Sequence, residues 1–152
     1  AATAIIAQAA LDQAEEIFIF TRQASYEKIV SKMAAISHQT KSRIQVLTLE
    51  DADSLQDKIN QSDLLVNGTS LGMDGINMPL PEQLELPSQI IVVDVIYQPF
   101  ETPFLKWARN QNVTAVNGLG MLLYQGAEAF ELWTGKPMPS QEIWQCLEEL
   151  YK

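Results

Sequence analysis

The sequence has few of the residue types that bind metals or form disulfide bonds. It contains one cysteine, Cys146, and one histidine, His38. A single cysteine cannot form an internal disulfide bond, which indicates a reducing compartment, and we expect a cytoplasmic location. Cys146 lies in an amphipathic segment near the end of the chain, and we expect its thiol to be packed and unreactive. His38 lies in a polar stretch, and a metal site would need more ligands than the sequence easily supplies, so we expect no metal.

Basic residues and long apolar runs are also scarce. The chain has 10 Lys and Arg against 19 Asp and Glu, a net charge of -9. Surfaces for nucleic acid or anionic membranes need clustered Lys and Arg, so we expect neither partner. No apolar run approaches the roughly 20 residues of a membrane-spanning helix. Residues 1–10 lack the basic start of a signal peptide and favour a buried helix.

Apolar patterning predicts helices and short strands in regular alternation. The expected helices are 2–14, 24–36, 51–60, 102–110, 121–133 and 140–150, and the expected strands are 16–20, 43–49, 63–67, 89–95 and 113–116. Alternation with short connections is typical of a parallel sheet with right-handed crossovers. The sequence therefore predicts an α/β fold, a Rossmann-like doubly wound parallel sheet with C-terminal helices. We expect residues 1–152 to form a single domain.

Several polar residues and glycines follow the expected strands. Ligands of open α/β sheets bind outside the carboxyl ends of strands, where these residues lie. The segments are DLLVNGTSLGM at 63–73, DVIYQP at 94–99 and NGLGMLLYQ at 117–125. Asn67, Thr69 and Ser70 indicate a ligand contact, although ordinary turn chemistry favours the same residue types. The chain begins with a helix, whereas nucleotide-binding α/β domains begin with a strand and a glycine-rich turn.

Thr21 and Arg22 follow the first expected strand. In a dinucleotide fold this strand ends beside the adenosine ribose, where an acidic residue would favour NAD. The strand end here has no acid, and Arg22 can form bidentate, charge-assisted bonds with a 2′-phosphate. Thr21 and Ser25 can add hydroxyl donors. The alternative is a solvated arginine in a turn.

The three polar segments resemble motifs of the shikimate dehydrogenase family. The counterparts are DLLVNATSLGM, D-x-x-Y-x-P followed by TP-x-L, and NGLGML followed by Q, AF and WTG, and they match residues 63–73, 94–105 and 117–135. Their order and spacing agree along essentially the whole chain. The resemblance implies an oxidoreductase that uses NADP and reversibly reduces 3-dehydroshikimate to shikimate in chorismate and aromatic amino acid biosynthesis.

The resemblance also implies roles for individual residues. Cofactor binding falls to Ala1, Thr21, Arg22, Ser25, Asn67, Thr69, Ser70, Val95, Gly118 and Met121. Val95, Gly118 and Met121 would lie beside the nicotinamide. Tyr97 would offer its hydroxyl to the substrate carboxylate, and Gln125 would reach a ring hydroxyl of shikimate. Without the resemblance, Tyr97 reads as an interfacial core residue, and Met121 and Gln125 as one side of a helix.

Parts of the family's protein have no counterpart in this sequence. Family members have an N-terminal domain with a catalytic Lys and Asp, and then a strand and a glycine-rich turn; Ala1–Ile5 resembles the residues directly after that turn. We therefore expect a fragment of an enzyme, without catalytic residues of its own, inactive and weak in NADP binding. The missing strand should separate the sheet into two halves with open edges, which favours a homo-oligomer.

Two alternatives stay open. The parent protein could be a quinate or quinate/shikimate dehydrogenase, or the chain could be a non-catalytic module that keeps the fold. Phe130, Trp133 and Trp144 are expected to pack in the core without a functional role.

Overall fold

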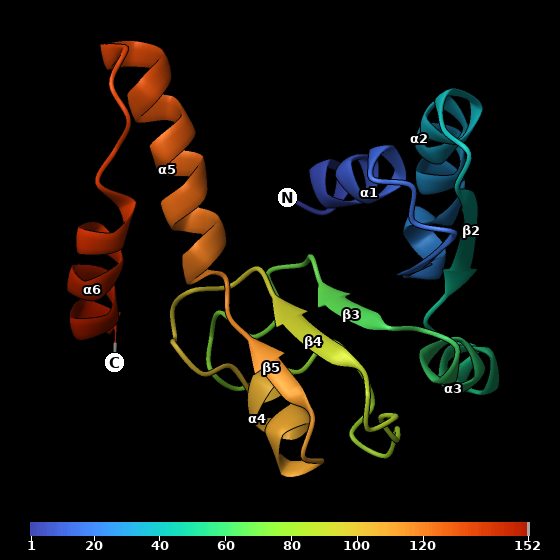
Figure 1. Ribbon diagram of the computed structural model, residues 1–152. Coiled ribbons are helices and arrows are strands. Elements are labelled where there is room, and N and C mark those ends of the chain that lie inside the picture. The colour runs from blue at the N-terminus through green and yellow to red at the C-terminus, as the bar shows by residue number, and fades with distance from the viewer. Residues whose placement is uncertain (152) are drawn as a thin grey trace. The chain divides into compact units, whose positions relative to one another are not determined.

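The computed structural model describes residues 1–151, which divide after Ser62 into two compact units. The first unit contains α1 (Ala2–Leu11), β1 (Glu16–Thr21), the 3-10 helix η1 (Gln23–Ser25), α2 (Tyr26–Gln39), β2 (Arg43–Thr48) and α3 (Ala52–Asn60). The second contains β3 (Leu64–Asn67), β4 (Ile91–Asp94), α4 (Pro103–Asn110), β5 (Thr114–Val116), α5 (Leu119–Thr134) and α6 (Ser140–Tyr151). Figure 1 shows these elements in order.

The first unit is built on a pair of parallel strands. β1 and β2 pair in register from Glu16 opposite Arg43 to Thr21 opposite Thr48. Helix α2 packs against β2, and α1 packs against α2. The buried apolar residues of this unit are Ala10, Met33, Leu55 and Ile59. Only Ala10 of α1 is buried, so the expectation of a buried first helix is wrong: α1 packs along one side only.

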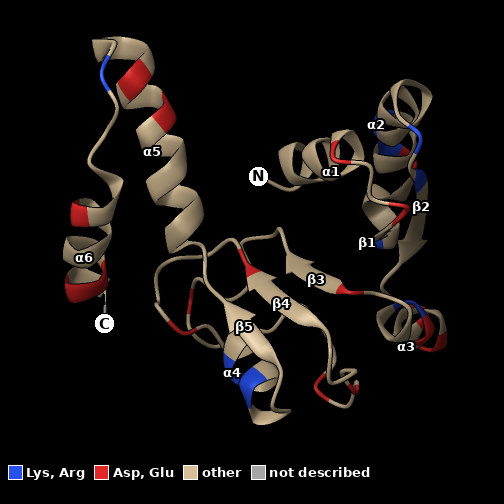
Figure 2. Ribbon diagram, in the orientation of Figure 1, with Lys and Arg blue, Asp and Glu red and all other residues tan. Residues whose placement is uncertain are grey.

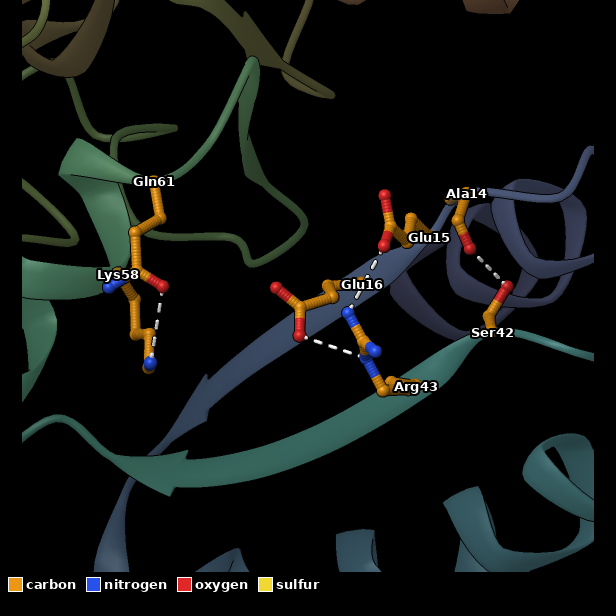
Figure 3. A network of polar contacts seen from close by, with 7 residues as sticks. All are labelled: Ala14, Glu15, Glu16, Ser42, Arg43, Lys58 and Gln61. Carbon is orange, nitrogen blue, oxygen red and sulfur yellow. Dashed lines mark hydrogen bonds and ion pairs between the residues drawn. The ribbon is translucent and has the colours of Figure 1, made fainter.

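Polar contacts join the starts of β1 and β2, as Figure 3 shows. The Arg43 guanidinium donates to Glu16 Oε1 at 3.0 Å and to Glu15 Oε1 at 3.2 Å. The Ser42 hydroxyl donates to the carbonyl oxygen of Ala14. Exposed ion pairs such as those of Arg43 contribute only about 0–1 kcal/mol. They therefore contribute little to the stability of the unit.

The second unit is built on a parallel sheet with the strand order β3-β4-β5 (Figure 1). Helix α4 packs against β4 and β5, and α5 packs against α6. The continuous apolar run at β4 suits a strand with neighbours on both sides. Val92 in its middle is fully buried, as are Leu105 and Ala108 of α4.

Helix ends agree with local sequence signals. Asp51 caps α3 by accepting from the backbone N–H of Ser54 at 3.0 Å. Thr102 caps α4 by accepting from Leu105 N at 3.3 Å, with Pro103 at the first turn. Gly135 ends α5 in the left-handed conformation, with φ of 68°. Each of these ends depends on neighbouring residues alone.

The α/β class is confirmed, with parallel strands and flanking helices throughout the described chain. The strands form two separate sheets, as the missing strand led us to expect. None of the helices in residues 1–151 combines the length and the apolar character needed to cross a membrane.

Expectations about packing of the last two helices are corrected. Cys146 is exposed, and so is the side chain of Trp133, at 81%. Phe130 is 38% exposed. Within the second unit, helices α5 and α6 pack mainly on each other. Trp144 does pack: its ring lies beside Gly120, 3.7 Å from where a Cβ would be.

Candidate functional site

The carboxyl ends of β3, β4 and β5 meet at one edge of their sheet (Figure 1). The register places Asn67 beside Asp94 and Val93 beside Val116. Ladder contacts continue past the strands, because Val95 N donates to Asn67 O at 3.1 Å and Gly118 N donates to Ile96 O at 2.9 Å. The sheet therefore brings together the residues that follow its three strands.

A buried polar network connects two of these strand ends. Asp94 and Thr102 are fully buried, and Asn67 is 4% exposed. Asp94 Oδ1 accepts from Asn67 Nδ2 and from the backbone N–H of Ile96, both at 3.1 Å. Asp94 Oδ2 accepts from the Thr102 hydroxyl at 2.7 Å. The sequence placed Asp94 in an expected strand and Thr102 at the start of an expected helix, but neither in a network.

The loop after β3 is shaped by the Asn67 side chain. Asn67 Oδ1 accepts from Thr69 N at 3.0 Å and from Thr69 Oγ1 at 2.7 Å, and Asn67 Nδ2 also donates to Leu71 O at 3.0 Å. The amide of Asn67 is thus engaged within the protein. Thr69 and Ser70 are exposed and present their surfaces to solvent. A cofactor contact by Asn67, Thr69 or Ser70 stays a prediction.

Gly118 lies flat against the backbone that follows β4. A Cβ on Gly118 would overlap the carbonyl group of Val95 and would lie 3.1 Å from the carbonyl carbon of Ile96. Its φ is -76°, so close approach and not an unusual conformation requires glycine here. Asn117 fixes the same turn, because its Nδ2 donates to Phe100 O at 3.1 Å.

Tyr97 stands at the exposed side of this edge. Its side chain is 37% exposed, and its ring meets the ring of Tyr151 edge-on, with centroids 5.7 Å apart and planes at 86°. Such aromatic pairs contribute about 0.5–1.5 kcal/mol beyond their buried area. Gln98, Pro99 and Phe100 with the end of α6 line a shallow hollow beside it. The contact with Tyr151, at the far end of the chain, had no signal in the sequence.

Helix α5 begins directly after Gly118. Met121 is 41% exposed and Gln125 is exposed, one turn apart on this helix. The first two turns of α5 carry no charged residue, as Figure 2 shows. An uncharged helix start with an accessible methionine offers an apolar surface to a flat ring.

The first unit holds the other predicted residues. Thr21 ends β1. The exposed Arg22 precedes η1 and the half-buried Ser25 is its last residue, with Ser25 N donating to Arg22 O at 2.8 Å. Within residues 1–151, Arg22 forms no ion pair. Ala1 is exposed and begins α1, where its carbonyl oxygen accepts from Ala4 N at 2.9 Å.

One acidic residue of the first unit escaped the sequence-based prediction. Glu50 Oε1 accepts from the backbone N–H of Gln23 at 3.2 Å, directly after Arg22. The carboxylate comes from the segment after β2, which lies beside β1 in the sheet. The pairing of β1 with β2 was the signal that could have identified Glu50, because parallel strands end at the same edge.

Charge elsewhere in the structure does not form a metal site. Among residues 1–151 no group of three or more His, Cys, Asp and Glu side chains could hold a metal ion.

Hydrogen bonds from Asn77 and then Ile76 hold the pKa of Asp74 below its ordinary value of 3.8. Asp74 lies in the exposed turn after the loop of Thr69 and Ser70.

Comparisons with known proteins agree with the motifs. The profile of the Shikimate 5'-dehydrogenase C-terminal domain matches residues 118–148. A curated relative from Streptococcus sanguinis, named Shikimate dehydrogenase (NADP(+)), is 95% identical over all 152 residues, which are 54% of that protein. The chain spans about half the length of the curated relatives it matches.

Two solved structures have a similar fold. Shikimate 5-dehydrogenase from Listeria monocytogenes, in complex with shikimate and NAD, is 39% identical with a TM-score of 0.88, over 96% of this chain and 52% of that one. The ligand-free 5-ketofructose reductase of a Gluconobacter species is 30% identical with a TM-score of 0.78, over 99% of this chain and 53% of that one. With its motifs, its strand ends and its 95% identical relative in agreement, the chain is similar along its whole length to part of the shikimate dehydrogenases.

Proposed function

We propose that this chain forms the NADP-binding part of a shikimate dehydrogenase, which reduces 3-dehydroshikimate to shikimate with NADPH and catalyses the reverse reaction. The convergence of the strand ends at Asn67, Asp94 and Gly118 carries the proposal, because ligands of α/β sheets bind there. The names of the relatives support it, since they include NADP(+) and the Listeria structure contains shikimate. The proposal includes the cytoplasmic location expected from the single cysteine.

The residues present fit a phosphorylated nicotinamide cofactor. Arg22 is exposed and without an ion pair in the described chain, so its guanidinium can bind a 2′-phosphate. The buried Gly118 packs its backbone against Val95, and Met121, which is 41% exposed near the start of α5, offers a polarizable apolar group. The bound cofactor supplies the hydride that reaches the carbonyl carbon of the substrate.

The substrate roles fall to two exposed polar side chains. The Tyr97 hydroxyl donates a hydrogen bond to a carboxylate, and the Gln125 amide can donate to or accept from a ring hydroxyl. Neither group is a suitable acid for the proton that the reduced oxygen receives. That proton comes from outside these residues, so we expect the isolated chain to orient ligands without turning them over.

The test uses a chimera in which this chain replaces the matching 54% of the Streptococcus sanguinis relative. We expect shikimate oxidation with NADP, and we expect Arg22→Ala to raise KM for NADP by about 10- to 100-fold, because a hydrogen bond to a charged group contributes about 1.5–3 kcal/mol. NAD is the matched control, since it lacks the 2′-phosphate, and its KM should change little. A chimera with no activity on shikimate, or equal losses with both cofactors, contradicts the proposal.

The same assay separates the alternatives. Faster turnover of quinate than of shikimate would indicate a quinate dehydrogenase, and the Gluconobacter neighbour makes 5-ketofructose a third substrate to compare. A chimera that binds NADP in fluorescence titration but turns over none of the three would indicate a non-catalytic module.

We also propose that the isolated chain forms a homo-oligomer. In residues 1–151, β1 pairs with β2 alone and β3 with β4 alone, so each of these strands has an unpaired edge. Unpaired edges are templates for strand addition. Light scattering should give a mass above the 17.0 kDa of one chain. A monomer at all concentrations would contradict this.

A further inference from the structure

The buried Asp94 carboxylate is the hub of the network at the strand ends. We propose that Asp94 is a positioning residue that holds the predicted cofactor loop and the predicted substrate tyrosine at a fixed separation. The inference rests on the proposed function, which assigns the cofactor loop to Thr69 and Ser70 and the substrate carboxylate to Tyr97. It adds a residue that touches neither ligand.

One oxygen atom of Asp94 joins the two segments. Asp94 Oδ1 accepts at 3.1 Å from Asn67 Nδ2, which belongs to the end of β3. The same oxygen accepts at 3.1 Å from Ile96 N, which lies between Val95 and Tyr97. Since this oxygen is fully buried, water cannot replace either partner without an opening of the structure.

The connection continues from Asn67 into the exposed loop. Asn67 Oδ1 holds both the backbone N–H and the hydroxyl of Thr69, and Thr69 Oγ1 accepts from Leu71 N at 3.1 Å. A rotation of the Asn67 amide would therefore move Thr69. Two hydrogen bonds connect Thr69 to Asp94: the Thr69 hydroxyl donates to Asn67, and the Asn67 amide donates to Asp94. A change in the position of Thr69 after substitution of Asp94 would therefore show that the two residues are coupled.

The second oxygen of Asp94 has a different task. Asp94 Oδ2 accepts from Thr102, whose oxygen accepts in turn from Leu105 N and so caps α4. This arm fixes the first turn of the helix, and Thr102 also lies beside Gly72, with its Cβ 3.4 Å from where a Cβ of Gly72 would be. The two arms make it feasible to separate positioning from stability, because Thr102 can be changed without removing the bonds to Asn67 and Ile96.

The chimera described above provides the kinetic test, with three variants. Asp94→Ala removes all three bonds and should lower kcat/KM for shikimate by on the order of 10-fold or more, since a misplacement of about 1 Å can cost on the order of 100-fold. Asp94→Asn keeps an acceptor for Asn67 and Ile96, with the Thr102 hydroxyl accepting from the new amide, and should restore most of that loss. Thr102→Val should lower the unfolding temperature while leaving KM for NADP and for shikimate close to the parent values.

A test by amide hydrogen exchange in the same chimera does not depend on activity or on Asp94→Ala folding. Thr69→Val changes an exposed residue and removes the hydroxyl that donates to Asn67. We expect exchange of the Ile96 amide to become faster by about 2- to 30-fold, the range of coupling found along connected networks. Exchange at Val93, which lies between the ladder donors Ile91 and Val95 in the pairing of β3 with β4, is the internal control and should stay unchanged.

Each outcome decides the inference. The inference is overturned if Thr102→Val lowers kcat/KM as much as the Asp94 variants do for the same loss of unfolding temperature. It is also overturned if the exchange rate of the Ile96 amide is the same in Thr69→Val as in the parent chimera. Rescue by Asp94→Asn together with a responsive Ile96 amide supports it. A parent chimera without shikimate turnover refutes the proposed function instead, and the exchange experiment then still tests the link from Thr69 to Ile96.

Discussion

Replacement of Gly118 by alanine should strongly destabilise the second unit. The new Cβ would overlap the carbonyl group of Val95, which is backbone and cannot rotate away as a side chain could. Overpacking usually costs about 1–3 kcal/mol and more where nothing can move, so we expect a loss of at least about 3 kcal/mol. At about 4–8 °C per kcal/mol for a unit of this size, the unfolding temperature should fall by at least about 12 °C.

The assay can observe the second unit alone, because Trp107, Trp133 and Trp144 all lie after Ser62. Tryptophan fluorescence during thermal or urea unfolding therefore reports on this unit. Gly126→Ala is the matched control: Gly126 lies inside α5 with nothing within 4 Å of a Cβ. This change should stabilise the unit by about 0.5–1 kcal/mol. Shifts of the same sign for both variants, or a loss below about 1 kcal/mol for Gly118→Ala, would refute the steric argument.

Three further predictions concern exposed groups. Glu50→Gln should tighten binding of 2′,5′-ADP by about 2- to 5-fold in calorimetry and leave 5′-AMP unchanged, because a negative charge next to Arg22 disappears. The carboxyl carbon of Asp74 should titrate with a midpoint below 3.8 in NMR, because hydrogen bonds led by Asn77 favour its ionised form. The stability that this turn gains from ionised Asp74 is then present above pH 3.8 and is lost as the pH falls through the lowered pKa. Cys146 should react with a thiol reagent in the native protein as fast as in urea, since it is exposed.

Each of these has a clear contrary result. Equal changes for the two nucleotides would show that Glu50 acts through the fold and not through the 2′-phosphate. An Asp74 midpoint at or above 3.8 would contradict its hydrogen bonding. If Cys146 reacted with the reagent only after unfolding, its thiol would be packed, as the sequence led us to expect.

Features that depend on neighbouring residues were predictable. The helix ends at Asp51, Thr102 and Gly135 are of this kind, because a cap needs only a side chain and the next turn. The convergence of the strand ends was predictable for a related reason, since parallel strands direct their carboxyl ends to one edge. The ligand contacts of that edge stay predictions.

Features that depend on distant partners were not predictable. Amphipathic spacing indicates which face of a helix is apolar, but not whether another element covers it, and Trp133 and Cys146 were therefore misplaced in a core. The role of Asp94 depends on Asn67 and Thr102, which are 27 and 8 positions away. Nothing in the local pattern shows that these three meet in the interior.

The edge-on contact between Tyr97 and Tyr151 has a practical consequence. The final turn of α6 rests on the tyrosine that we expect to bind the substrate. A purification tag fused behind α6 would bring extra, freely moving peptide next to that phenol. Affinity and kinetic measurements should therefore use tags at the opposite terminus, or protein from which the tag has been cleaved.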